Sequence, residues 1–345
     1  MKNKKISIKD VAEEAGVSPA TVSRVINDTD YPVKNKTKKA VKEAVEKLNY
    51  QPNQVARNLA KKQSNIIGII VHDISSAYFS EMLRGIEDTF FENNYIINIC
   101  DTRYSVKRQL KDLNLLQANH VEAVIFPGGV IYEDDYLKDI KKCFQTLKED
   151  GCRIIGVTSN PFDIKNVDVG NVLASRTITE YLINYGHEKI AYVNGPEIMN
   201  ATSERLKGYK EALQNRDLEV VHDLIIDGDF SFKGGRQAAL NLLEKKHKFS
   251  AVVAANDESA LGLMWEFQQR GIEVPEEVSI VGIGNIPRSK CSYPPLTTVN
   301  LPLHEIGENI GNYIINKLDT KNYITEEYEV NVGIVERQSV KNMNM

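Results

Sequence analysis

Two short helix patterns joined by a glycine turn occupy residues 7–27, and they constrain the fold of the N-terminal part most strongly. Ser7 precedes Asp10 by three residues, which is the spacing of a capping box, so a helix is predicted to begin at Ile8. Gly16 permits a left-handed turn, and Ser18 followed by Pro19 is typical of the start of a second helix. The sequence therefore predicts a helix, a tight turn and a second helix.

A third amphipathic helix is predicted around Lys36 to Leu48, where apolar residues repeat at helical spacing. The three predicted helices are expected to share one small core. The residues expected to form it are Val11, Ala15, Val22, Val25, Ile26, Val41, Val45 and Leu48. The N-terminal part is therefore expected to be an all-α helix-turn-helix unit.

The second helix of such a unit enters the major groove with its N-terminal and outer residues. In this sequence those positions hold Pro19, Ala20, Thr21, Ser23 and Arg24. Arg24 is the best candidate for a guanine contact, and Ala20 is a candidate for contact with a thymine methyl group. A helical hairpin without any partner shows the same local pattern, so further features have to decide between the two interpretations.

Charge divides the chain in the way that DNA binding requires. Residues 1–62 contain 14 Lys and Arg against 7 Asp and Glu, a net charge of +7, whereas the remaining residues contain 29 against 40, a net charge of −11. A basic end on an acidic body is drawn to phosphates while the body is repelled by them. The charge supports DNA binding but gives no sequence preference.

The length of 345 residues and the apolar content of 42% suffice for two or three domains. No apolar run is long enough to span a bilayer, and the polar start of the chain does not resemble a signal peptide, so we expect a cytoplasmic protein with no membrane contact. The four cysteines have no CxxC pairing and no histidine at ligand spacing, which predicts neither a disulfide framework nor a zinc site. We expect Cys100, Cys143, Cys152 and Cys291 to be packing residues and predict no cofactor.

From Asn65 onward, short β-rich apolar runs alternate with amphipathic helices, which is the rhythm of parallel sheets. Two doubly wound sheets are predicted, and the change from one to the other is expected near Thr158 to Asp163. After the runs NIIGIIVHD and YIINICD, strands are predicted at 123–126, 153–157, 189–193, 224–226, 250–254 and 279–283.

The run DVAEEAGVSPATVSRVIN resembles the DNA-binding headpiece of the lac-repressor (LacI/GalR) family, and YQPNQVARNLA resembles the hinge helix of that family. The resemblance implies a headpiece over 1–62 that includes a hinge helix over about 52–60. Its implied DNA-binding residues are Ser7, Lys9, Ser18, Pro19, Ala20, Thr21, Ser23, Arg24, Asn27, Tyr50, Asn53, Val55, Ala56, Arg57 and Leu59.

The hinge segment is too short to be a stable helix alone, because isolated helices need about 12–15 residues. We expect it to fold when two copies pair on DNA. In the family, two hinge helices enter the minor groove side by side, and the residue matching Leu59 wedges between the central base pairs. The resemblance implies that Asn53 and Arg57 contact the DNA backbone or minor groove, that Leu59→Ala abolishes specific binding, and that the operator is nearly palindromic.

Five further motifs of the body resemble the same family and occur in the family's order: GHEKIAYVNGP, RLKGY, GDFSFKGG, ANDESALG and YPPLTTV. They imply an effector-binding and dimerisation domain over 63–345 with the fold of periplasmic sugar-binding proteins. The first subdomain is expected over about 64–160 plus 291–322, and the second over about 161–290 plus 323–340.

The resemblance places a small-molecule site between these two subdomains. Its implied lining is Asp73 and Phe79 from the first subdomain and Arg205, Phe230 and Asn256 from the second. Arg205 is able to donate two hydrogen bonds to a hydroxyl pair, a carboxylate or a phosphate, and Phe230 offers a flat face to a sugar or purine ring.

Two positions depart from the family pattern, which commonly has aspartate at Gly284 and glutamine at Leu301. Both residues of the family face ligand hydroxyls, so this chain lacks two polar contacts to a sugar. The effector is therefore expected to be a sugar, a phosphorylated metabolite or another small molecule.

The resulting prediction is a sequence-specific transcriptional regulator, most simply a dimeric repressor, whose operator affinity changes with lobe closure. The C-terminal sequence after ERQSV has no leucine heptads, so a homodimer is expected rather than a tetramer. DISSAYFSEMLRGIEDTF resembles the catabolite-control branch, in which a phosphorylated carrier protein is the corepressor. An enzyme and a solute-binding protein are the alternatives. The sequence contains no phosphate loop and no nucleophile elbow, which argues against an enzyme. A solute-binding protein would have no basic headpiece.

Overall fold

The structure is a computed structural model that describes residues 6–26, 32–50, 64–319 and 330–345. The chain forms two compact units, Met1–Ser64 and Asn65–Met345. The predicted hinge helix over 52–60 lies outside the described residues.

The first unit is the predicted three-helix arrangement of α1 (Ile8–Glu14), α2 (Pro19–Ile26) and α3 (Asn35–Lys47). The α1 helix begins at Ile8 as predicted, because the Ser7 backbone N–H and hydroxyl both donate to the Asp10 carboxylate, at 2.7 and 2.6 Å. Gly16 has a φ of +65°, which confirms the left-handed turn. The buried core consists of Val11, Ala12, Val22, Val41 and Ala44.

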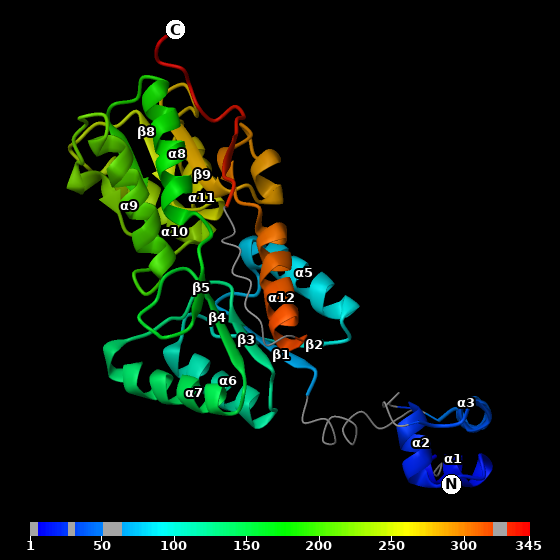
Figure 1. Ribbon diagram of the computed structural model, residues 1–345. Coiled ribbons are helices and arrows are strands. Elements are labelled where there is room, and N and C mark those ends of the chain that lie inside the picture. The colour runs from blue at the N-terminus through cyan, green and yellow to red at the C-terminus, as the bar shows by residue number, and fades with distance from the viewer. Residues whose placement is uncertain (1–5, 27–31, 51–63, 320–329) are drawn as a thin grey trace. The chain divides into compact units, whose positions relative to one another are not determined.

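The second unit contains two sheets with helices on both faces, as predicted (Figure 1). The first sheet has the order β2-β1-β3-β4-β5, and all its neighbouring strands are parallel. Its strands are β1 (Ile66–Val71), β2 (Ile96–Asp101), β3 (Ala123–Phe126), β4 (Arg153–Val157) and β5 (Lys165–Val167).

The second sheet has the order β11-β10-β9-β8-β6-β7, and only the pair β10 and β11 is antiparallel among its described strands. Its strands are β6 (Ile190–Val193), β7 (Ile225–Ile226), β8 (Ala251–Ala254), β9 (Ser279–Gly284), β10 (Thr297–Asn300) and β11 (Gly333–Val335). Short 3₁₀ turns occur at Asp134–Tyr136, His222–Leu224 and Pro287–Lys290.

Helices cover both faces of each sheet. We call the first sheet with its four helices lobe one and the second sheet with its four helices lobe two. Lobe one contains α5 (Ala77–Glu92), α6 (Val106–Ala118), α7 (Leu137–Glu149) and α12 (Leu303–Asp319); lobe two contains α8 (Asn171–Asn184), α9 (Asn200–Gln214), α10 (Phe232–Leu243) and α11 (Asp257–Gln269). Within lobe one, α5 and α12 lie side by side (Figure 1).

Strand pairing corrects the predicted subdomain boundaries at two places. Residues 165–167 form β5 and pair with β4, so the chain leaves the first sheet after Val167 rather than at Thr158 to Asp163. Residues 297–300 form β10 and pair with β9 in the second sheet, although 291–322 was assigned to the first subdomain. The sequence does not reveal β10 because two of its four residues are threonines, whose burial depends on partners elsewhere in the chain.

The cysteines are free, and Cys291 is exposed. The prediction that all four are packing residues is therefore wrong for Cys291. Among the described residues, no helix combines the length and the apolar character that crossing a membrane would require.

Candidate DNA-binding and effector sites

The α2 helix presents its predicted reading face away from the headpiece core. Val22 is fully buried, while Pro19, Ala20 and Arg24 are exposed or half-buried at the surface, as are Thr21 and Ser23. Ser18 caps the helix, since its hydroxyl accepts a hydrogen bond from the Thr21 backbone N–H at 3.2 Å. The helix thus presents the short side chain of Ala20 and the long cationic side chain of Arg24 one turn apart.

The other predicted DNA-binding residues of the headpiece divide into three groups. Ser7 and Lys9 are exposed at the start of α1. Tyr50 is half-buried and packs against the headpiece core. The remaining predicted residues lie outside the described residues: Asn27, Asn53, Val55, Ala56, Arg57 and Leu59.

The effector site predicted in the body is built around a buried arginine. Arg205, on α9, has only 3% of its surface exposed. Its Nε donates to Asn171 Oδ1 at 2.8 Å and its Nη1 donates to the Ala255 carbonyl at 2.5 Å. Among the described residues, no Asp or Glu side chain forms an ion pair with Arg205. A buried guanidinium paired only with neutral acceptors keeps a positive charge that no neighbouring carboxylate compensates.

Aromatic rings from both lobes lie beside this guanidinium. Its carbon is 5.6 Å from the centre of the Phe230 ring in lobe two and 5.8 Å from the centre of the Tyr78 ring in lobe one. Phe230 has a φ of +63°, and a Cβ at Gly195 would overlap its ring. Glycine at 195 is therefore required for the ring to occupy this place.

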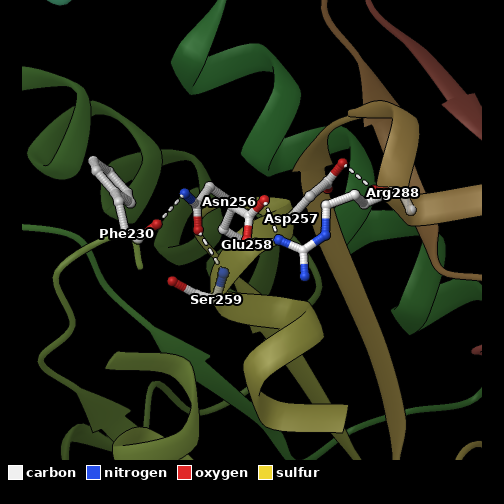
Figure 2. A network of polar contacts seen from close by, with 7 residues as sticks. Phe230, Asn256, Asp257, Glu258, Ser259 and Arg288 are labelled. Carbon is white, nitrogen blue, oxygen red and sulfur yellow. Dashed lines mark hydrogen bonds and ion pairs between the residues drawn. The ribbon is translucent and has the colours of Figure 1, made fainter. Parts of the chain in front are cut away.

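Asn256 holds Phe230 in position rather than presenting a free amide (Figure 2). Its Nδ2 donates to the Phe230 carbonyl at 2.7 Å, and its Oδ1 accepts from the Ser259 backbone N–H at 2.9 Å as the cap of α11. The amide is thus engaged at both ends by the protein. Asn194, which follows β6, instead has a buried Oδ1 with no hydrogen-bond partner in the described part of the chain.

The two lobe-one residues of the predicted site have local structural roles. The carboxylate of Asp73 accepts from the Ser75 backbone N–H and hydroxyl, at 2.9 and 2.6 Å, just before α5. Phe79 is buried and packs against His72 and Tyr78. The neighbouring Tyr78 is the residue that reaches Arg205, and the sequence analysis missed it; the adjacent aromatic pair was the only signal.

His72 packs against Phe79 and is fully buried. Its Nδ1 lies 3.1 Å from the Thr102 hydroxyl and its Nε2 lies 3.0 Å from the Gly129 carbonyl. Burial lowers the pKa of His72 to about 4, so the ring is neutral at physiological pH. The His72 ring therefore adds no charge beside Phe79.

Gly284 and Leu301, the two departures from the family pattern, line an open pocket of about 520 Å³. Its wall comes from the start of α5, the segment after β9, the segment between β10 and α12, and Arg337. None of the five predicted effector residues, all of which the structure describes, lines this pocket.

Asp257 and Glu258 form a second polar cluster at the start of α11. The buried Asp257 carboxylate accepts from the Ile286 N–H, the Ser289 hydroxyl and the Thr298 hydroxyl, at 2.9, 2.7 and 2.5 Å. Burial nevertheless raises its pKa. Glu258 pairs with Arg288 at 3.0 Å (Figure 2). These contacts join α11 to the segment after β9, and no group of three or more His, Cys, Asp or Glu among the described residues is placed to hold a metal ion.

Comparison with known proteins agrees with the fold of both units. Residues 7–53 match the family "Bacterial regulatory proteins, lacI family", and residues 179–340 match the "Periplasmic binding protein-like domain". The chain is 34% identical over 345 residues to the HTH-type transcriptional repressor PurR of Vibrio atlanticus, covering 98% of this chain and 99% of that one. It is 35% identical over 304 residues to catabolite control protein A of Priestia megaterium, covering 88% and 89%.

A solved structure of the lac repressor dimer bound to operator and the anti-inducer ONPF matches with a TM-score of 0.85 and 26% identity, covering 98% of this chain and all of that one. The fold and the headpiece therefore define a helix-turn-helix DNA-binding transcriptional regulator with a periplasmic-binding-protein-like body. The chain belongs to the lacI family of bacterial regulatory proteins, as the sequence analysis predicted. Its relatives are transcriptional regulators rather than enzymes.

Proposed function

We propose that this protein is a repressor that binds a nearly palindromic operator as a homodimer and responds to a small anionic effector held at Arg205. It would act on the chromosome in the cytoplasm, and we expect no enzymatic activity. The buried Arg205, which has no carboxylate partner among the described residues and lies beside rings from both lobes, carries the ligand-responsive part of this proposal.

Base reading is assigned to the exposed face of α2. Arg24 is the proposed guanine contact and Ala20 the proposed thymine-methyl contact. The exposed Lys9, Lys34 and Lys42 supply the positive charge that favours phosphates. The proposed role of the family's hinge residues, Leu59 above all, rests on the sequence resemblance alone.

A homodimer is supported by apolar side chains exposed along one edge of lobe one. The strand β2 is the last strand of its sheet, and large apolar residues are exposed on it and beside it. This lobe-one apolar edge consists of Phe91, Ile96, Ile99 and Leu115, which are 73%, 66%, 42% and 51% exposed. An unpaired apolar edge of this kind is a liability in a monomer, so we propose that a second copy covers it.

The effector is proposed to carry an anionic group beside a ring. Arg205 supplies the positive charge, Phe230 and Tyr78 supply flat apolar surface, and the unpaired Asn194 Oδ1 would accept a hydrogen bond from the ligand. The positive charge of Arg205, paired only with the neutral acceptors Asn171 and Ala255, favours a phosphorylated or carboxylated ligand over a plain sugar. A phosphorylated carrier protein stays an alternative partner because of the catabolite-control relative.

The proposal is tested by selecting binding sites from a randomised DNA library with the purified full-length protein at a fixed salt concentration of about 0.1 M. We expect a two-fold-symmetric motif. Arg24→Ala should weaken binding by about 1–3 kcal/mol and relax the preference at one base pair in each half-site. Lys42→Ala, on the exposed face of α3, is the control and should weaken binding to all sequences alike.

Recovery of no motif, with or without added phosphorylated metabolites or carrier protein, would contradict the proposal. The effector is sought separately by following the thermal unfolding of the full chain against phosphorylated sugars, nucleotides and their unphosphorylated counterparts. A stabilisation that requires the phosphate group is expected, because a ligand that binds only the folded state raises the unfolding free energy.

A further inference from the structure

Glu204 connects the two lobes at the edge of the proposed effector site. It is on α9 in lobe two, and its Oε1 accepts from the Ser159 N–H at 3.1 Å and from the Ser159 hydroxyl at 2.6 Å. Ser159 follows β4 and belongs to lobe one. The Asn200 side chain, also on α9, donates to the Ser159 carbonyl. One loop residue of lobe one is thus bound through its N–H, its hydroxyl and its carbonyl.

The backbone beside this contact is strained. Thr158 has a φ of +80°, a conformation that β-branched residues rarely adopt, and its buried hydroxyl has no partner among the described residues. Its N–H donates to the Val167 carbonyl at 2.9 Å. A strained backbone conformation persists only where surrounding contacts hold it in place. The contacts between Ser159 and α9 are adjacent to Thr158 in the chain.

Asn171 connects the same carboxylate to the effector arginine. Asn171 is fully buried at the start of α8; its Nδ2 donates to Glu204 Oε2 at 2.8 Å, and its Oδ1 accepts from Arg205 Nε at 2.8 Å. Since a carboxylate only accepts and a guanidinium only donates, a single orientation of the Asn171 amide satisfies both neighbours. The amide therefore links the interlobe contact to the orientation of Arg205.

We propose that Glu204 is an interlobe clamp and that Asn171 makes the orientation of Arg205 depend on whether the clamp is closed. The inference rests on the proposed function in that Arg205 is taken as the effector-binding residue. Opening of the lobes removes the two Ser159 donors from Glu204, which frees the carboxylate to move and releases Asn171 from its fixed orientation. Lobe closure and effector binding then favour each other.

The chain of donors and acceptors predicts how substitutions combine. Glu204→Gln brings an amide NH₂ group, which is a donor, against either the Asn171 Nδ2 donor or the Ser159 donors. Turning the Asn171 amide over does not remove this donor–donor mismatch, because its NH₂ group would then face the Arg205 Nε donor. Asn171→Asp places two carboxylates against each other. The double variant restores every pair, because the introduced aspartate accepts from both Arg205 and the introduced glutamine, whose side-chain oxygen still accepts from Ser159.

The experiment is hydrogen–deuterium exchange of the full-length, ligand-free protein, read on the peptide that spans Thr158 to Ile164. Each single variant should raise the exchange rate of this peptide about tenfold, since hydrogen bonds to charged groups are lost, and the double variant should return to within about twofold of the wild type. Single variants that exchange like the wild type, or a double variant as fast as the faster single variant, would overturn the clamp.

Two controls keep the result interpretable. Glu211→Gln removes the same charge from the same helix, but Glu211 pairs with Arg176 and Lys207 inside lobe two, at 3.7 Å each, so exchange at Thr158 to Ile164 should not change. Ser159→Ala removes only the exposed hydroxyl donor and does not endanger folding; it should raise exchange of the same peptide by a smaller factor. An unchanged rate in this variant as well as in Glu204→Gln contradicts the clamp without any concern about misfolding.

Inorganic phosphate serves as the probe for the connection to Arg205. We expect phosphate to slow exchange of the Thr158 to Ile164 peptide in the wild type and to have no such effect in Asn171→Ala. Phosphate that binds but slows exchange equally in both proteins would refute the role of Asn171. Absence of phosphate binding to the wild type counts against the proposed anion site, whereas the clamp is judged by the ligand-free double-mutant cycle.

Discussion

At the scale of single residues, burial decides the chemistry of several side chains whose type alone was ambiguous. His72 is the clearest case, because a histidine at the end of a strand next to a predicted ligand site is open to either a catalytic or a structural interpretation. Full burial against Gly129 and Thr102 lowers its pKa to about 4 and makes it a neutral packing residue.

The buried neutral His72 predicts an acid-sensitive body. The unfolded chain binds the proton near pH 6.5 and the folded chain only near pH 4, so stability is complete above about pH 6.5 and is lost as the pH falls toward 4. Between pH 7.5 and 5 the loss attributable to His72 should be about 2 kcal/mol. Urea unfolding of the wild type and of His72→Gln at both pH values checks this. An identical pH dependence in the two proteins would contradict it.

At the scale of secondary-structure elements, glycines set how closely helices approach. A Cβ at Gly85 on α5 would overlap the His304 carbonyl, and a Cβ at Gly307 on α12 would overlap the Met82 carbonyl. The two helices therefore contact each other through their backbones. Apolar residues of both helices, among them Ile86 and Ile310, continue the contact into the core of lobe one.

We predict that Gly307→Ala destabilises the body by about 1–3 kcal/mol, because the added methyl group has only backbone atoms against it and α12 must move away from α5. Gly333→Ala is the control, since a Cβ there meets no atom of the described residues within 4 Å. The measurement is the midpoint of urea unfolding. Equal midpoints for Gly307→Ala and the wild type would show that the helices are not in backbone contact.

For the protein as a whole, the proposed dimerisation would connect the body to DNA recognition. A two-fold-symmetric operator requires two headpieces, and the lobe-one apolar edge of the body is the surface proposed to bring them together. Under this proposal, binding of both half-sites would depend on a surface of the body outside the headpiece.

A charge on this edge should separate the dimer. Ile96→Glu places a carboxylate in the centre of the proposed contact and is expected to give a monomer by light scattering, together with at least a tenfold loss of operator affinity. Leu173→Glu changes a comparably apolar residue, 36% exposed on α8, and should leave the dimer intact. A dimeric mass for Ile96→Glu would place the interface elsewhere.

Local patterns in the sequence were sufficient for the elements that local interactions define. The capping of α1 by Ser7 and Asp10, the turn at Gly16 and most strands of the two sheets follow from spacing and periodicity. The missed strands are short or polar: β5 and β11 have three residues each, and β10 contains Thr297 and Thr298. Their pairing depends on strands that are remote in the sequence, as in β10, where the Thr298 hydroxyl donates to Asp257.

The helix-turn-helix unit, the parallel αβ body, the charge division and the lacI family could all be predicted from the sequence alone, because short motifs or composition define each of them. The tertiary fold was needed to show which side chains meet at the proposed effector site. It engages both ends of the Asn256 amide, places Phe79 in the core, and brings Tyr78 beside Arg205. It also joins Glu204 to Ser159 across the lobes. A side chain's role at such a site depends on partners that are far away in the chain, and local spacing carries no information about them.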